Sequence, residues 1–201
     1  MQHPDISQLL VANSHWSERI RRYCPDFFLK SAGTPQAPKI LWIGCADSRV
    51  PESVITDSAP GDIFVHRNIA NQLLENDDNA HSALAFAVSE NIGVQHVVVV
   101  GHSICGAAQH AVQCAALGQD PPTVTALDRW LAPLTRLAGE LDLPPDNDKA
   151  VEILVEENVR VQVENVHKAL GGSPVWVHGL VYDLRDGCLR DLGITKEPFP
   201  R

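Results

Sequence analysis

The sequence predicts an α/β fold, in which a central, mainly parallel β-sheet is flanked by helices and preceded by an N-terminal helical arm. Short, continuous apolar runs such as KILWIG and QHVVVVGH are typical of strands that are buried on both faces. Longer segments with apolar residues at helical spacing separate these runs, and strands that alternate with helices form parallel sheets. The length of 201 residues favours a single domain over 1–201, which we divide into an arm, 1–35, and an α/β core, 36–201.

Local signals set the bounds of each expected element. The arm has apolar residues with a helical period, the strands are short runs rich in valine and isoleucine, and Asp or Asn caps and glycines bound the helices. We therefore expect, in chain order, a helix at 5–23, a loop at 31–39, strands at 39–44 and 62–66, a helix at 79–92, a strand at 95–102, a helix at 105–117, a helix ending near 139, a helix at 149–170 and a last strand within 173–187.

Composition argues against several classes of partner. The formal net charge is −9 and no basic run occurs, so we expect no nucleic acid and no anionic membrane surface as a partner. The longest apolar stretch is too short to span a bilayer. The N-terminus lacks a signal-peptide pattern, and the five cysteines are an odd number. Together these features predict a reducing, cytoplasmic location, while WSERIRR at 16–22 keeps organelle import as an alternative.

Two of the predicted strands end in residue types that bind metals. One runs into GCADSR at 44–49 and the other into GHSICG at 101–106. The carboxyl ends of neighbouring parallel strands share one edge of a sheet, where ligands bind in α/β folds. Cys45, His102 and Cys105 would converge there, and two thiolates with an imidazole are three ligands of a tetrahedral zinc site. We expect the glycine before each motif to let the backbone bend tightly.

The cysteines are also compatible with other kinds of site. Each motif taken separately is compatible with a small buried cysteine in the core. A closed structural zinc site usually has four Cys or His ligands, but Cys24, Cys114 and Cys188 lie in helical or turn segments and form no second pair. A catalytic zinc is therefore favoured. A phosphatase-like nucleophile at Cys45 is disfavoured, because no glycine-rich phosphate cradle follows it.

Asp47 and Arg49 suggest how the fourth zinc position is used. Asp47 is two residues past Cys45, close enough to bind the metal, and Arg49 can hold the Asp47 carboxylate in a bidentate pair. While Asp47 is paired with Arg49, zinc keeps a water whose pKa can fall from 15.7 to about 7. When Asp47 binds zinc instead, no hydroxide forms. The alternative is a surface turn with a local ion pair, worth at most about 1 kcal/mol.

These residues resemble the β-class carbonic anhydrases. The similarity lies in CADSR at 45–49, GDIFVHRNIAN at 61–71 and GHSIC at 101–105, and it extends from about residue 38 to residue 192. It implies a carbonate dehydratase, a zinc lyase that reversibly hydrates carbon dioxide to bicarbonate and a proton through zinc-bound hydroxide. It also implies a homodimer or homotetramer, in which the helix at 5–23 embraces a partner subunit.

The resemblance also implies roles for single residues. Zinc, one ion per subunit, would be held by Cys45, His102 and Cys105, with Asp47 and Arg49 as the catalytic dyad. In addition, we expect backbone N–H groups near Gly106 to bind a substrate oxygen, because this glycine lies at a strand-to-helix turn.

Three further residues match one subgroup of the family. Trp42, Arg67 and Tyr182 stand where that subgroup has a non-catalytic bicarbonate pocket, and bicarbonate there favours the inactive state with Asp47 on zinc. A guanidinium and two aromatic donors can hold a small anion. The alternative is that Trp42 and Tyr182 only pack in the sheet and that Arg67 pairs with an acid.

Two residues depart from the family pattern. Members often have His-x-Asp-Cys-Gly-Gly at the second motif, whereas this chain has Ile104 and Ala107 at two of those positions. The ligands are intact, so the departures concern the shape of the substrate pocket and the turnover. Two alternative functions stay open: a zinc hydrolase of carbon disulfide or carbonyl sulfide, and a bicarbonate or zinc sensor with low activity.

Overall fold

The computed structural model describes residues 3–118, 121 and 123–199 of the chain. They form two compact units, Met1–Gln36 and Ala37–Arg201. The first contains the helices α1 (Pro4–Tyr23) and α2 (Phe27–Gly33). The helix α1 was predicted, but α2 was not, and the loop expected at 31–39 begins only after Gly33. The ring of Phe28 on α2 packs edge-on against Trp16 on α1, with 5.6 Å between the ring centroids, and this contact stabilises the second helix.

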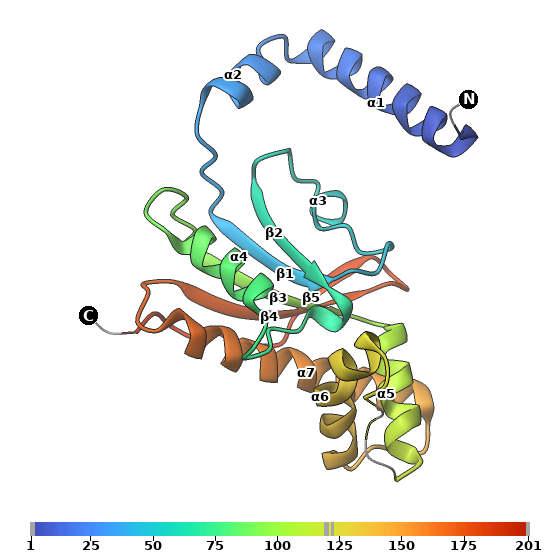
Figure 1. Ribbon diagram of the computed structural model, residues 1–201. Coiled ribbons are helices and arrows are strands. Elements are labelled where there is room, and N and C mark those ends of the chain that lie inside the picture. The colour runs from blue at the N-terminus through green and yellow to red at the C-terminus, as the bar shows by residue number, and fades with distance from the viewer. Residues whose placement is uncertain (1–2, 119–120, 122, 200–201) are drawn as a thin grey trace. The chain divides into compact units, whose positions relative to one another are not determined.

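The second unit is built on a five-stranded sheet with the order β2-β1-β3-β4-β5 (Figure 1). The first four strands of the chain pair in parallel, and β5 pairs antiparallel with β4. The predicted α/β fold with a mainly parallel sheet is therefore confirmed. The sequence pattern did not predict β5, because all four of its residues are exposed and form no apolar run. The strands are β1 (Ile40–Cys45), β2 (Ile63–Asn68), β3 (His96–His102), β4 (Trp176–Asp183) and β5 (Cys188–Asp191).

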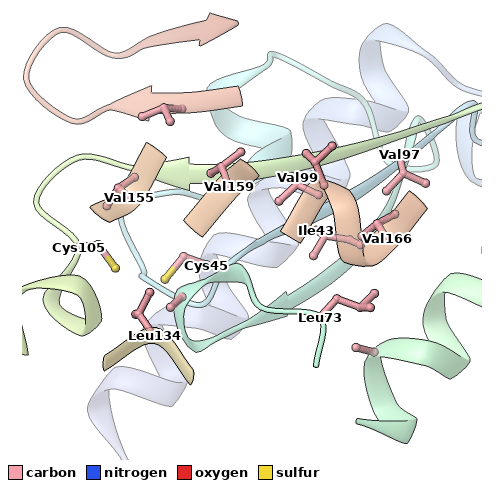
Figure 2. Packing of buried hydrophobic residues seen from close by; sticks show 14 of the residues in the cluster. Ile43, Cys45, Leu73, Val97, Val99, Cys105, Leu134, Val155, Val159 and Val166 are labelled. Atoms are coloured by element: carbon pink, nitrogen blue, oxygen red, sulfur yellow. The ribbon is translucent and has the colours of Figure 1, made fainter. Parts of the chain in front are cut away.

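Helices cover one face of this sheet. The long helix α7 packs on β3 and β4, and α4 packs on β2 and on α7. A row of buried valines on α7 faces the strands, as Figure 2 shows for Val155, Val159 and Val166. None of the helices in the described ranges is long and apolar enough to cross a membrane. The helical elements of this unit are α3 (Glu52–Ile55), η1 (Ile69–Asn71), α4 (Asp78–Val88), α5 (Gly106–Ala116), α6 (Ala126–Glu140) and α7 (Asn147–Leu170).

Strand register places the two motif-bearing strand ends side by side. In the parallel pair of β1 and β3, Gly44 lies opposite Val100. Cys45, the last residue of β1, is therefore next to the end of β3 that carries His102. Side chains alternate between the two faces of a strand, so Cys45 shares the core face of β1 with Leu41 and Ile43.

The glycines before the two motifs have a different role from the one expected. Neither Gly44 nor Gly101 has a positive φ, and both lie inside regular strands. A Cβ at Gly101 would lie 2.8 Å from Cγ2 of Val159 and 2.9 Å from Cγ1 of Val155. The absence of a side chain therefore lets α7 approach β3. At Gly44 a Cβ would collide with the indole of Trp42. Close packing, rather than a tight bend, explains both glycines.

Candidate metal centre

Cys45, His102 and Cys105 come together at the carboxyl ends of β1 and β3. Their two sulfur atoms and one imidazole nitrogen all lie within 4.8 Å of one another, and all three side chains are buried. Figure 2 shows Cys45 and Cys105 at the end of the packed core, near Val155 and Leu134. The two strands supply one thiol and the imidazole, and the turn after β3 supplies the second thiol. The arrangement can offer three of the four ligands of a tetrahedral zinc ion.

The imidazole of His102 is oriented for a metal. Its Nδ1 lies 2.9 Å from the carbonyl oxygen of Ser103, and a donated Nδ1–H leaves the lone pair on Nε2. This Nε2 atom is buried and has no hydrogen-bond partner among the described residues. Buried polar nitrogens are normally paired. A metal ion is the partner that best fits an unpaired Nε2 beside two sulfur atoms.

The two thiols titrate very differently because they are adjacent. The neighbouring groups Cys105 and His102, and the backbone N–H of Asp47, lower the pKa of Cys45. The pKa of Cys105 is raised by its hydrogen bond to Cys45, by burial and by the charge of Cys45. Burial acts to lower the pKa of His102, but the neighbouring Cys45 and the nearby negative charges raise it overall. One thiolate thus forms readily, and a second one beside it requires a cation.

Asp47 and Arg49 form a bidentate ion pair next to these ligands. The guanidinium donates from Nε to Oδ1 at 3.0 Å and from Nη2 to Oδ2 at 2.7 Å, and the Arg49 backbone N–H donates to Oδ1 at 2.9 Å. These bonds hold the pKa of Asp47 at about 2. Asp47 Oδ2 also lies 4.0 Å from Nε2 of His102. The pair is therefore more than an isolated surface turn, because its carboxylate borders the three candidate ligands.

Arg67 holds the backbone that carries Asp47. Its Nε donates to the carbonyl oxygen of Cys45 at 2.8 Å, and its Nη2 donates to that of Asp47. The carbonyl oxygen of Asn68 accepts from the N–H of Ala46 at 2.8 Å, so the end of β2 fixes three consecutive residues. Arg67 also pairs with an acid, as the alternative interpretation expected, because its Nη1 lies 3.7 Å from Glu52 Oε2. Sequence reasoning missed this backbone contact, which joins residues about twenty positions apart.

Trp42, Arg67 and Tyr182 lie on one face of the sheet but on different strands. The register puts Trp42 opposite Val65 and Arg67 opposite Gly44, so β1 and β2 bring these two close together. Tyr182 is on β4, three strand spacings of about 4.8 Å from β2, which is about 14 Å. Its hydroxyl lies 3.7 Å from the position a Cβ of Gly187 would take, in the β4–β5 turn.

Gly106 is the first residue of α5. A Cβ there would meet no atom within 4 Å, so packing does not require a glycine. The N–H groups of Ala107 and Ala108, the next two residues, donate to the sulfur of Cys105 and act to lower its pKa. The first turn of α5 therefore directs these two donors at a candidate metal ligand.

Ile104 has the left-handed backbone conformation, with a φ of +56°. This conformation is strained for a β-branched residue, whereas Asp and Asn tolerate it. The aspartate expected at this position from the family pattern would adopt this conformation with less strain, so the departure at Ile104 concerns the backbone as well as the pocket shape. The carbonyl oxygen of Ile104 accepts from Nη2 of Arg49 at 3.3 Å, so this residue links the two motifs.

Comparisons with known proteins agree with this geometry. The family model described as carbonic anhydrase matches residues 40–189. A carbonic anhydrase of Emericella nidulans is 36% identical over 199 residues, covering 93% of this chain and 83% of the relative. A tetrameric β-carbonic anhydrase of Sordaria macrospora has a TM-score of 0.84 at 35% identity, covering 96% of this chain and 100% of that one.

A second solved structure extends the comparison. The Coccomyxa β-carbonic anhydrase, solved in complex with acetazolamide, has a TM-score of 0.86 at 33% identity, covering 98% of this chain and 90% of that one. The resemblance and the enzyme class expected from the three motifs are thus confirmed, and the chain belongs to the β class of the carbonic anhydrase family.

Proposed function

We propose that this chain is a zinc-dependent carbonate dehydratase, which reversibly hydrates carbon dioxide to bicarbonate and a proton. The observation that carries the proposal is the buried group of Cys45, His102 and Cys105 beside a carboxylate held by arginine. Zinc bound there would act as a Lewis acid and lower the pKa of a coordinated water. Membership of the family supports the choice of metal and of substrate.

Asp47 and Arg49 act as the catalytic dyad in this proposal. With a pKa of about 2, Asp47 is ionised throughout the neutral range and can accept a hydrogen bond from the group that occupies the fourth zinc position. Arg49 keeps both carboxylate oxygens engaged, which holds Asp47 away from the metal. The N–H of Gly106, at the start of α5, is the donor that we propose for a substrate oxygen.

We further propose that bicarbonate regulates the enzyme through Trp42, Arg67 and Tyr182. Arg67 supports this idea, because its guanidinium contacts the carbonyl oxygens of Cys45 and Asp47. An anion that competes for this guanidinium would loosen the segment that carries Asp47 and favour the state with Asp47 on zinc. The position of Tyr182 on a more distant strand makes it the least supported of the three residues.

Self-association as a dimer or tetramer belongs to the same proposal, supported by the tetrameric relative from Sordaria macrospora. The cytoplasmic location expected from the sequence stays a prediction.

Stopped-flow measurement of carbon dioxide hydration, on protein of known zinc content, tests the proposed reaction. We expect turnover to scale with bound zinc between pH 6.5 and 9 and to be lost in Cys105→Ala. Cys114→Ala is the matched control, because Cys114 is a free cysteine on α5 that does not belong to the ligand group. Full zinc content without turnover at any pH would contradict the proposal and favour the low-activity sensor or a sulfur-containing substrate.

A further inference from the structure

Ser103 lies between two of the candidate zinc ligands and is fully engaged in hydrogen bonds. Its carbonyl oxygen is 2.9 Å from Nδ1 of His102. Its N–H donates to the carbonyl oxygen of Tyr182 at 2.9 Å, its hydroxyl donates to Oδ1 of Asp183 at 2.8 Å, and the same hydroxyl accepts from the N–H of Leu184 at 2.9 Å. The residue is 5% exposed. The peptide that orients His102 is thus fixed by the end of β4 and the turn that follows it.

Asp183 is itself held in place from two sides. The backbone N–H of Arg185 donates to its Oδ1 at 2.9 Å, and Nη1 of Arg185 lies 3.7 Å from its Oδ2. The same Nη1 donates to Oε1 of Glu152 on α7 at 2.8 Å. The backbone donor from Arg185 and the Ser103 hydroxyl lower the pKa of Asp183, so it accepts as a carboxylate. The contacts form one chain from α7 through Arg185, Asp183 and Ser103 to His102.

We propose that Asp183 and Ser103 are positioning residues for the metal ligand His102. Neither is expected to touch substrate. Their part is to fix the Ser103 carbonyl, which in turn sets the tautomer and the ring orientation of the imidazole. The inference rests on the proposed zinc site, and it assigns to the β4–β5 turn a function in metal binding.

The surroundings of Ser103 leave room for movement if this series of hydrogen bonds is broken. A cavity of about 130 Å³ is bordered by Ser103, Asp183 and Arg185, together with residues of α7 and β5. Without the Asp183 carboxylate, the Ser103 hydroxyl loses its acceptor, and the peptide can rotate toward this space. Loss of a partner that orients a ligand typically weakens metal binding by about 10- to 100-fold.

Zinc affinity of three full-length variants, measured by competition with a chromophoric chelator, tests the proposal. Asp183→Ala removes the acceptor, whereas Asp183→Asn keeps an oxygen at that position. Asp186→Ala is the matched control, because Asp186 accepts a hydrogen bond from the N–H of Cys188 at 2.8 Å in the same turn, whereas the partners of Ser103 among the described residues are His102, Tyr182, Asp183 and Leu184. We expect the zinc Kd to rise about 10- to 100-fold in Asp183→Ala and to change by less than about 3-fold in the other two. The visible bands of bound cobalt should shift only in Asp183→Ala.

Two results would overturn the inference: an unchanged zinc Kd in folded Asp183→Ala, or an equal loss in Asp186→Ala, which would indicate general destabilisation of the turn. If Asp183→Ala does not fold, Ser103→Ala takes its place with the same criterion. Measuring zinc binding and hydration activity of the wild-type protein alongside the variants distinguishes a failure of this inference from a failure of the proposed function. Zinc binding without hydration activity would contradict only the reaction, whereas normal activity with an unchanged Kd in the variant would contradict only the positioning role.

Discussion

The two strand ends that form the metal centre are organised in different ways. At the end of β1, the side chain of Asp47 is held locally by the guanidinium and the backbone N–H of Arg49, two residues on, while Arg67 on β2 holds the backbone. At the end of β3, His102 is oriented by Ser103, and Ser103 is held by residues about eighty positions further along the chain. The Asp47–Arg49 ion pair is therefore encoded in a five-residue motif, whereas the orientation of His102 depends on the completed fold.

This difference suggests a division of roles. The local pair at β1 can change partners without disturbing the sheet, since Arg49 has a half-exposed side chain. The end of β3 is buried, and its hydrogen bonds are satisfied by other elements. We infer that β1 supplies the movable group of the site and β3 the fixed one.

The largest effect on activity is expected from breaking the local pair with Arg49→Ala. Asp47 stays ionised without Arg49, because even an ordinary aspartate pKa of about 3.9 lies well below neutral pH. The freed carboxylate then competes for the fourth zinc position, and we expect hydration activity at pH 7 to fall by roughly 10- to 100-fold. Hydroxide competes better as the pH rises, so the loss should shrink toward pH 9. Stopped-flow rates from pH 6.5 to 9 measure this directly.

A matched control for this variant is Arg129→Ala, which also removes an exposed arginine but one that contacts the backbone carbonyls of Thr123 and Val124. A loss of the same size at every pH in Arg49→Ala, or one that grows with pH, would show that Arg49 does not act by restraining Asp47.

A smaller effect, on the free energy of unfolding, is expected at Ile104, where the two strand ends meet. This residue has a φ of +56°, a conformation that costs a residue with a Cβ about 1–2 kcal/mol. Ile104→Gly and Ile104→Ala both delete the side chain, but only glycine relieves the strain. We therefore expect the glycine variant to have the higher free energy of unfolding, by about 1 kcal/mol, although glycine usually destabilises relative to alanine. Urea denaturation of both variants provides the comparison, and a more stable alanine variant would show that the backbone is not strained there.

The same contrast explains what the sequence could and could not predict. The apolar strands, the long helices and the convergence of Cys45, His102 and Cys105 follow from local patterns and from the geometry of parallel strands. The short strand β5 escaped prediction because its residues are exposed. The contact of Ser103 with Asp183 could not be predicted, because it depends on how a distant turn folds over the end of β3.

A further unpredicted feature lies in the segment after β2. Ala70 and Asn71 both have a positive φ, which is unfavourable for alanine. The conformation is held by α7, where the side-chain amide of Asn158 donates to the carbonyl oxygen of Ala70 at 2.9 Å. A polar residue in the middle of a long helix gives no sign, in the sequence alone, of the distant carbonyl that it binds.

X-ray absorption spectroscopy of the zinc-loaded wild-type protein can show whether the ends of β1 and β3 hold one metal ion together. We expect two sulfur ligands at about 2.3 Å and two nitrogen or oxygen ligands at about 2.0–2.1 Å, with the sulfur signal reduced to one ligand in Cys45→Ala. A zinc ion without sulfur ligands, or one with two sulfur ligands that survive the loss of Cys45, would contradict this expectation.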